Sequence, residues 1–187
     1  MSDKMETRSA SSNVIHAGDD LRVSGYAAVF DDYAVIPSQQ YDYEVIDRNA
    51  FDHADFSRCV FRYNHSDHDQ LLARVSNDTL QLSVDDHGLR VDATLADTTQ
   101  GQDLYKLIKR ADVHAMSFGF IPAKTYVQNR VRHIAEIRTV VDVSAVDDPA
   151  YPTTSLEVVQ QRNAERAKKE AIALDEKRKR LYLACIS

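Results

Sequence analysis

The sequence predicts a mainly β protein with one internal helix and a helix at the C-terminus. Three observations support this prediction: many short apolar segments bounded by turn residues, one stretch with a helical period, and a final charged stretch without Gly or Pro. The β segments follow one another closely, as in hairpins. This spacing favours an antiparallel barrel or sandwich over a parallel sheet with crossover helices. A length of 187 residues suits one domain with a terminal appendage.

The first elements are a loose segment followed by three β segments. Residues 1–20 are rich in Ser, Asp and Asn and have no period, which predicts a flexible N-terminal arm. Residues 21–30 predict a strand whose glycine suits a bulge. Shorter strands are predicted at residues 43–46 and 59–63. The last of these leads into a polar turn at residues 64–69.

Three β segments then follow at close spacing, at residues 71–75, 79–84 and 89–95. The second and third are joined by a D-D-H-G turn, in which the glycine can adopt a positive φ. Residues 89–95 alternate strictly between apolar and polar side chains. One face of this strand is therefore expected to be buried and the other exposed to solvent.

The predicted internal helix lies within residues 98–113, where Leu104, Leu107 and Ile108 recur at helical spacing and Thr98 or Thr99 can cap the start. Two strands are expected next, at residues 115–121 and 131–146.

The remaining sequence, after two prolines that end the last strand, is rich in Ala, Glu, Lys, Arg and Gln. We therefore divide the chain into an arm (1–20), a β domain (21–155) and a charged C-terminal helix or tail (156–187).

Composition limits the classes of function. The net charge of −6 disfavours a nucleic-acid binder that relies on overall charge. The longest apolar run has six residues, whereas a membrane span needs about 20. We expect no membrane partner and no secretory signal, and the two distant cysteines fit a reduced cytosolic chain. Neither cysteine lies in a nucleophile motif.

Ser117 is the candidate nucleophile. With the period of a strand, Met116, Phe118 and Phe120 share one face, which is typical of a core. The other face is a strip of small residues with the Ser117 hydroxyl at its centre. A nucleophile that a peptide backbone must approach needs such a strip. The alternative is a solvent-exposed strand face that happens to carry Ser and Gly.

His65 and Asp142 are the candidate partners of Ser117. His65 follows an apolar strand, where its ring can act as a general base or lie in a surface loop. Asp142 stands between valines, and a buried carboxylate there would need a partner such as a histidine ring N–H. The alternative is a half-exposed aspartate on an edge strand. A metal site at His65 and His68 lacks an organised third ligand, so no metal is expected.

Five segments, taken together, resemble the prohead (capsid maturation) serine proteases of tailed phages. They read S-G-Y-A-A-V-F at 24–30, F-R-Y-N-H at 61–65, L followed by D-D-H-G-L across 80–89, S-F-G-F at 117–120, and D-V-S-A-V with P-A-Y-P across 142–152. The segments follow the family order and span most of the chain.

The resemblance implies a β-barrel serine protease, similar to herpesvirus assemblin, with Ser117 as nucleophile and His65 as base. The family usually has Glu where this chain has Asp142, so His133 and His114 stay open as alternative third members. Backbone N–H groups are the expected oxyanion donors, with Arg130 or Arg132 as an alternative.

The implied role is to trim the major capsid protein or the scaffold, and usually the protease itself. The implied location is the host cytoplasm, inside the assembling prohead. No cofactor and no nucleic acid are required, and a homo-oligomer stays open.

Two rival functions stand beside this one. The first is a non-catalytic assembly factor that keeps the fold and binds capsid or scaffold. The second is a metal-dependent hydrolase that uses His65 and His68. The separation of the Ser117 hydroxyl and the His65 ring distinguishes the first rival: a distance within about 4 Å supports catalysis.

Overall fold

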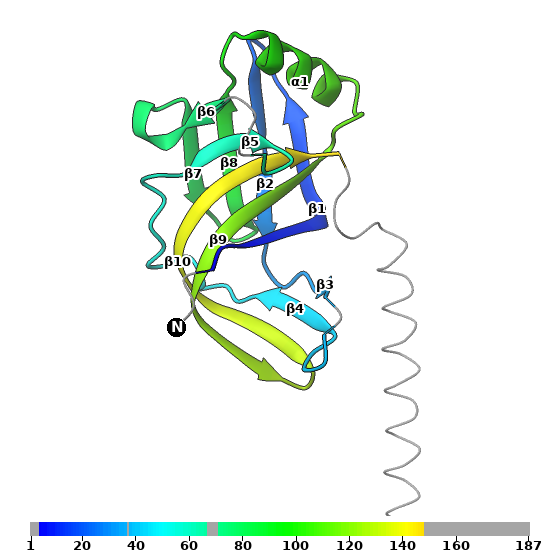
Figure 1. Ribbon diagram of the computed structural model, residues 1–187, viewed down its shortest axis with the longest axis vertical. Coiled ribbons are helices and arrows are strands. Elements are labelled where there is room, and N and C mark those ends of the chain that lie inside the picture. Colours follow the sequence, from blue (N-terminus) through cyan, green and yellow to red (C-terminus); the bar gives the residue numbers. More distant parts are fainter. Residues whose placement is uncertain (1–3, 37, 67–70, 148–187) are drawn as a thin grey trace, which may run out of the picture. The chain divides into compact units, whose positions relative to one another are not determined.

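The computed structural model describes residues 4–36, 38–66 and 71–147. These residues form a mainly β structure with one α-helix, as expected (Figure 1). Its elements are β1 (Glu6–Ala17), β2 (Arg22–Val29), β3 (Ala34–Val35), β4 (Tyr43–Ile46), β5 (Val60–Tyr63), β6 (Ala73–Arg74), a 3-10 turn (Val75–Asn77), β7 (Leu80–Val84), β8 (Gly88–Thr94), α1 (Thr99–Lys109), β9 (Ala115–Gln128) and β10 (Val131–Val146).

Helix α1 follows the local signals that predicted it. Thr98 is its N-cap, and its hydroxyl oxygen accepts a hydrogen bond from the Gly101 N–H at 3.2 Å. Leu104 and Ile108, one turn apart, are buried in the hydrophobic core. The capping and the apolar spacing therefore both agree with the sequence-based prediction.

The strands form one mixed sheet in the order β3-β4-β10-β9-β1-β2-β8-β7, with β5 and β6 attached beside β10. Most neighbours are antiparallel, but β10 pairs with β4 and with β5 in parallel. The expectation of a purely antiparallel sheet is corrected at these two places. Parallel pairing needs a long connection, which the many residues between β4 or β5 and β10 provide. The described pairings form an open path, without closure into a barrel.

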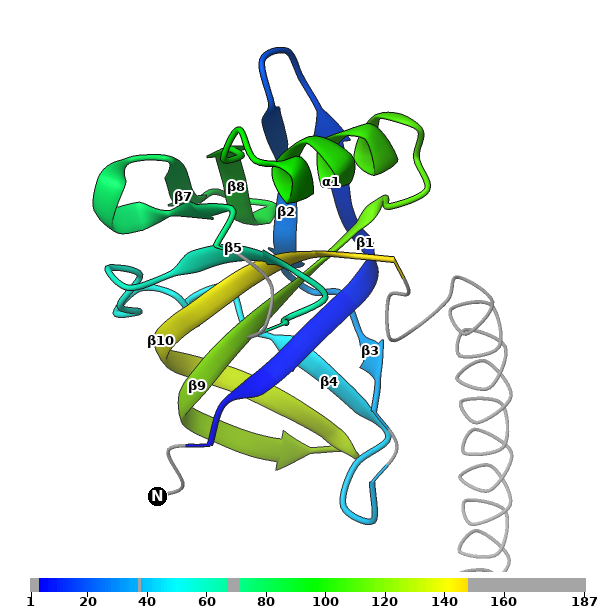
Figure 2. The same cartoon turned by 45° about the horizontal axis from the view of Figure 1, so that its top comes forward.

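The two longest strands, β9 and β10, run side by side and curve strongly (Figure 2). Their core face carries Met116, Phe118 and Phe120, all fully buried, and the last two rings stack with centroids 4.8 Å apart. The prediction of a core face at these three residues is confirmed. These strands also carry the candidate site on their other face.

Strand β1 differs from the flexible arm that the sequence predicts for residues 1–20. Its first part, residues 6–9, pairs with β9, and residues 15–17 pair with β2. The strand forms through backbone pairing with its neighbours, which requires no apolar period in its own sequence. Composition therefore gave no sign of it.

The predicted C-terminal helix and tail (156–187) lie outside the described residues. Of the helices in the described part of the chain, none is long and apolar enough to cross a membrane.

Candidate active site

The register of β9 against β10 brings four small or acidic residues to one face of the sheet. Ser144 lies opposite Ser117, and Asp142 lies opposite Gly119. Residues directly opposite in an antiparallel pair point to the same side, so these four form one patch. All three polar side chains in it are buried.

His65 reaches this patch through a turn at the end of β5. Strand β5 runs parallel to the end of β10, and its last residue, Tyr63, lies opposite Ala145, the neighbour of Ser144. Asn64 and His65 then take left-handed backbone conformations, with φ of 51° and 55°. Such conformations cost about 1–3 kcal/mol for residues other than glycine. The Asn64 N–H donates to the Ala145 carbonyl at 3.0 Å and the His65 N–H donates to Ser144 Oγ at 3.3 Å, which holds the turn in place.

The ring of His65 lies between the hydroxyl and the carboxylate. His65 Nε2 is 2.6 Å from Ser117 Oγ, and His65 Nδ1 is 2.6 Å from Asp142 Oδ2. The structure thus brings together all three residues that the sequence singled out. A hydroxyl, an imidazole and a carboxylate in this order resemble the triad of serine hydrolases, in which the acid orients the ring and the ring accepts the hydroxyl proton.

The alternative third members lie elsewhere. His133 Nδ1 is 2.8 Å from Asp47 Oδ1, and its ring stacks on Tyr126. His114 is exposed at the residue before β9. Neither appears among the contacts of the His65 ring in the described part of the chain.

Ser144 is a site residue that the sequence reasoning missed. Its hydroxyl donates to Asp142 Oδ2 at 2.7 Å, so this oxygen receives bonds from both Ser144 and His65. Asp142 is only 2% exposed, and its other oxygen, Oδ1, has no hydrogen-bond partner among the described residues. A buried carboxylate is tolerated only where hydrogen bonds replace water, and Ser144 supplies one of these bonds. Its place two residues after Asp142 on one strand was the available signal.

Cys59 lies close to the site but is a poor rival nucleophile. Burial, with a smaller contribution from the Asp142 carboxylate, raises the pKa of the Cys59 thiol to about 12. The thiol therefore stays protonated at neutral pH, and only a thiolate attacks efficiently.

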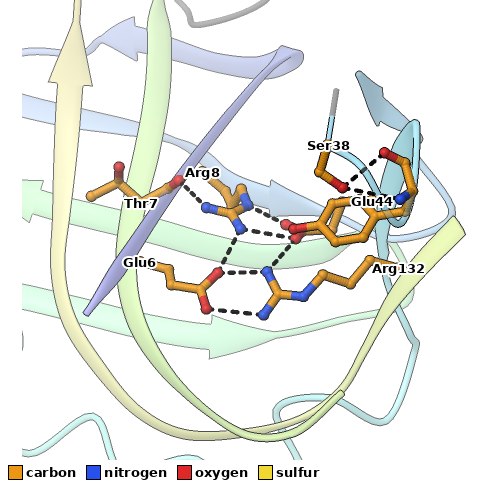
Figure 3. Close-up of polar contacts among 7 residues, drawn as sticks. Glu6, Thr7, Arg8, Ser38, Glu44 and Arg132 are labelled. Atoms are coloured by element: carbon orange, nitrogen blue, oxygen red, sulfur yellow. Dashed lines mark hydrogen bonds and ion pairs between the residues drawn. The ribbon is translucent and has the colours of Figure 1, made fainter. Parts of the chain in front are cut away.

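The two arginines considered as oxyanion donors are both held by carboxylates. Arg130 makes two 2.6 Å bonds to Asp42. Arg132 bonds to Glu6 and Glu44 in a charged cluster beside β1 (Figure 3). These ion pairs give both guanidinium groups a structural partner.

The metal-dependent alternative needs His68 as well as His65. The described residues contain no group of three His, Cys, Asp or Glu side chains that could hold a metal ion. His68 lies outside them.

Gly119 is a second residue whose close packing in the site the sequence did not reveal. A Cβ at this position would overlap Oδ1 of Asp142 and lie 3.1 Å from the Met5 methyl. The reason for glycine is close packing, since its φ is not positive. The small residue at this position therefore leaves the space that the Asp142 carboxylate occupies.

We expect Gly119→Ala to lower activity by about 10²-fold, because displacing Asp142 misplaces the His65 ring. Overpacking would also lower the free energy of unfolding by about 1–3 kcal/mol. Peptidase assays and thermal unfolding would measure both. Gly18→Ala is the matched control, since a Cβ there meets its nearest atoms at an ordinary 3.6 Å. Full activity of Gly119→Ala would contradict the packing argument.

A curved, mainly β sheet that carries a Ser–His–Asp line defines a serine-hydrolase-like class of protein. The sequence model of the family described as caudovirus prohead serine protease matches residues 4–170. The chain belongs to this family. Searches of curated proteins and of solved structures each found no match. The match includes all five segments on which the sequence-based resemblance rested and extends beyond them on both sides.

Proposed function

We propose that this chain is the serine endopeptidase that cleaves the scaffold, or the N-terminal scaffolding segment of the major capsid protein, and also itself inside the assembling prohead. Family membership supports a phage capsid maturation protease. The observation that carries the catalytic assignment is the pair of 2.6 Å contacts that link Ser117, His65 and Asp142. The curved sheet is compatible with the barrel of the herpesvirus enzymes, which stays part of the proposal.

The proposed reaction is acyl transfer. His65 Nε2 takes the hydroxyl proton as Ser117 Oγ attacks the peptide carbonyl carbon. The peptide C–N bond then breaks, and His65 Nε2 gives the proton to the leaving amine. Water, deprotonated by His65, hydrolyses the acyl-enzyme and regenerates the hydroxyl.

Asp142 and Ser144 act on His65 in this scheme. Asp142 Oδ2 accepts from the Nδ1–H, which leaves Nε2 without a hydrogen and ready to accept a proton. When the ring becomes charged, the carboxylate stabilises it. Ser144 holds the carboxylate in line through its own hydrogen bond.

The distance between hydroxyl and ring also bears on the assembly-factor alternative. A chain that only binds capsid or scaffold has no need for a hydroxyl 2.6 Å from an imidazole that is itself paired with a buried carboxylate. Burying a carboxylate and holding a histidine backbone in the left-handed conformation both cost free energy. A catalytic function accounts for this cost, whereas binding alone does not.

Co-expression with the major capsid protein and scaffold of the same phage tests the proposal. Intact-mass spectrometry should find a shortened capsid protein or scaffold only when the chain is present, and a fluorophosphonate should prevent the shortening. Capsid protein and scaffold that keep their full mass in particles assembled with the chain would contradict the endopeptidase function.

Asp142→Ala should lower the cleavage rate by about 10³- to 10⁴-fold, because the ring loses the group that selects its tautomer and stabilises its charge. The loss should be smaller than for removal of the base itself. Rates of peptide cleavage would measure it, with the exposed Asp52→Ala as control. Unchanged activity would remove Asp142 from the triad.

A further inference from the structure

The first part of β1, here called the N-terminal segment (residues 6–9), lies along the nucleophile strand. It pairs antiparallel with residues 117–120 of β9, with residue 9 opposite Ser117 (Figure 2). Among the described pairings it has no second strand neighbour, because β1 joins β2 only at residues 15–17. Without this segment, β9 would present a free backbone edge beside Ser117. Such an edge binds an extended peptide by strand addition.

The backbone of the segment contacts the nucleophile. Ser117 Oγ is 2.8 Å from the Arg8 carbonyl oxygen and can donate to it, while His65 Nε2 lies 2.6 Å from the same hydroxyl. A hydroxyl has a single hydrogen, so it cannot donate to both acceptors at once. The Arg8 carbonyl therefore competes with the base for the proton that catalysis must move. A peptide carbonyl is also the group that a substrate would bring to this place.

The side chains of the segment complete a charged cluster with two residues of the sheet. Glu44 of β4 is only 2% exposed and is bonded by Arg8, through Nε and through Nη2 at 2.8 Å, and by Arg132 of β10 at 2.7 Å. Arg132 also makes bonds of 2.6 and 2.9 Å to Glu6 (Figure 3).

The bonds to Arg132 hold the pKa of Glu6 below its usual range, so this carboxylate stays ionised. Burial alone would lower the pKa of Arg8, but the contacts with Glu44 and Glu6 together outweigh burial and raise this pKa, so the guanidinium stays charged. The sheet thus presents the buried carboxylate of Glu44 and the guanidinium of Arg132. These two groups can pair with a basic and an acidic residue that lie two positions apart on a strand.

We propose that the N-terminal segment occupies the position of a substrate strand, and that Glu44 and Arg132 select substrates with an acidic residue two positions before a basic one. This inference rests on the proposed function of Ser117. The segment acts as an internal competitor that a substrate must displace. Since the Arg8 carbonyl lies at Ser117, the basic residue of a substrate is the one whose carbonyl is attacked.

Two peptides of identical composition test the selection. One is Lys-Met-Glu-Thr-Arg-Ser-Ala-Ser-Ser, the sequence of residues 4–12. The other exchanges the two charges, as Lys-Met-Arg-Thr-Glu-Ser-Ala-Ser-Ser. We expect kcat/KM of the full-length chain to be at least 10-fold higher for the first peptide, with cleavage after arginine, because the exchanged charges face like charges at Glu44 and Arg132. Equal rates would overturn the selection.

Arg8→Ala tests the competition. Loss of the Glu44 contact should loosen the segment, and labelling of Ser117 by a fluorophosphonate should become at least 5-fold faster. Arg90→Ala removes an exposed ion pair with Asp92 and is the matched control, with unchanged labelling. Thermal unfolding verifies that both variants are folded. Unchanged or slower labelling of folded Arg8→Ala would show that the segment is merely structural.

These results also separate this inference from the proposed function. If wild-type chain and Arg8→Ala both resist labelling and cleave neither peptide, the assignment of Ser117 fails and the inference fails with it. If wild-type chain is labelled at Ser117 but treats both peptides alike, only the substrate selection is overturned.

Discussion

Ser117→Ala should abolish cleavage of the capsid or scaffold substrate and leave the fold intact. Loss of the attacking oxygen removes the acyl-enzyme route, and the equivalent change in a studied serine protease costs about 10⁶-fold in rate. The side chain is small and buried, and its removal leaves the sheet pairings of β9 unchanged. Mass spectrometry of the substrate after co-expression, with thermal unfolding of the variant, would measure both effects.

Ser83→Ala is the matched control, since it makes the same substitution at an exposed position of strand β7. It should cleave like the wild-type chain. Processing by Ser117→Ala within about tenfold of the wild-type rate would be far above the residual expected without a nucleophile and would show that another group attacks.

His65→Ala should be almost as damaging, with a loss of about 10⁴- to 10⁶-fold in kcat. Without the ring, nothing accepts the hydroxyl proton or returns it to the leaving amine. The change also removes the partner of a buried carboxylate, because Asp142 Oδ2 then keeps only its bond from Ser144. We therefore expect a lower melting temperature together with the lost activity.

The exposed His53→Ala is the control for His65→Ala, and it should retain wild-type activity. Kinetics on a common peptide, with melting curves of both variants, would separate the two effects of the ring. A folded His65→Ala chain that keeps more than about a tenth of the wild-type kcat would exclude His65 as the base.

Local patterns in the sequence predicted most of the elements. The alternation of 89–95 corresponds to β8, and the spacing of Leu104 and Ile108 corresponds to α1. Both patterns work because the period of a strand or a helix determines which side chains meet the core. The same kind of pattern made Ser117 a candidate, and their positions beside apolar residues made His65 and Asp142 candidates. The resemblance of five segments to a protease family then gave these residues their expected roles.

The tertiary structure alone decided what these elements contact. The parallel pairing of β10 with β5 brings His65 to Ser117 across 52 residues of chain, and no local pattern encodes such a pairing. The same holds for the hydrogen bond from the His65 N–H to Ser144 Oγ, which forms only because β5 lies beside β10.

Strand β1 is the clearest difference between sequence and structure. Its polar residues without a period predicted a flexible arm, yet residues 6–9 lie paired along β9. Arg8 and Glu6 look like ordinary surface charges until Glu44 and Arg132 are placed beside them. Backbone pairing and ion pairs depend on the partner as much as on the segment. The sequence by itself therefore determined which reactive and charged side chains the chain has. The tertiary structure decided which groups those side chains contact.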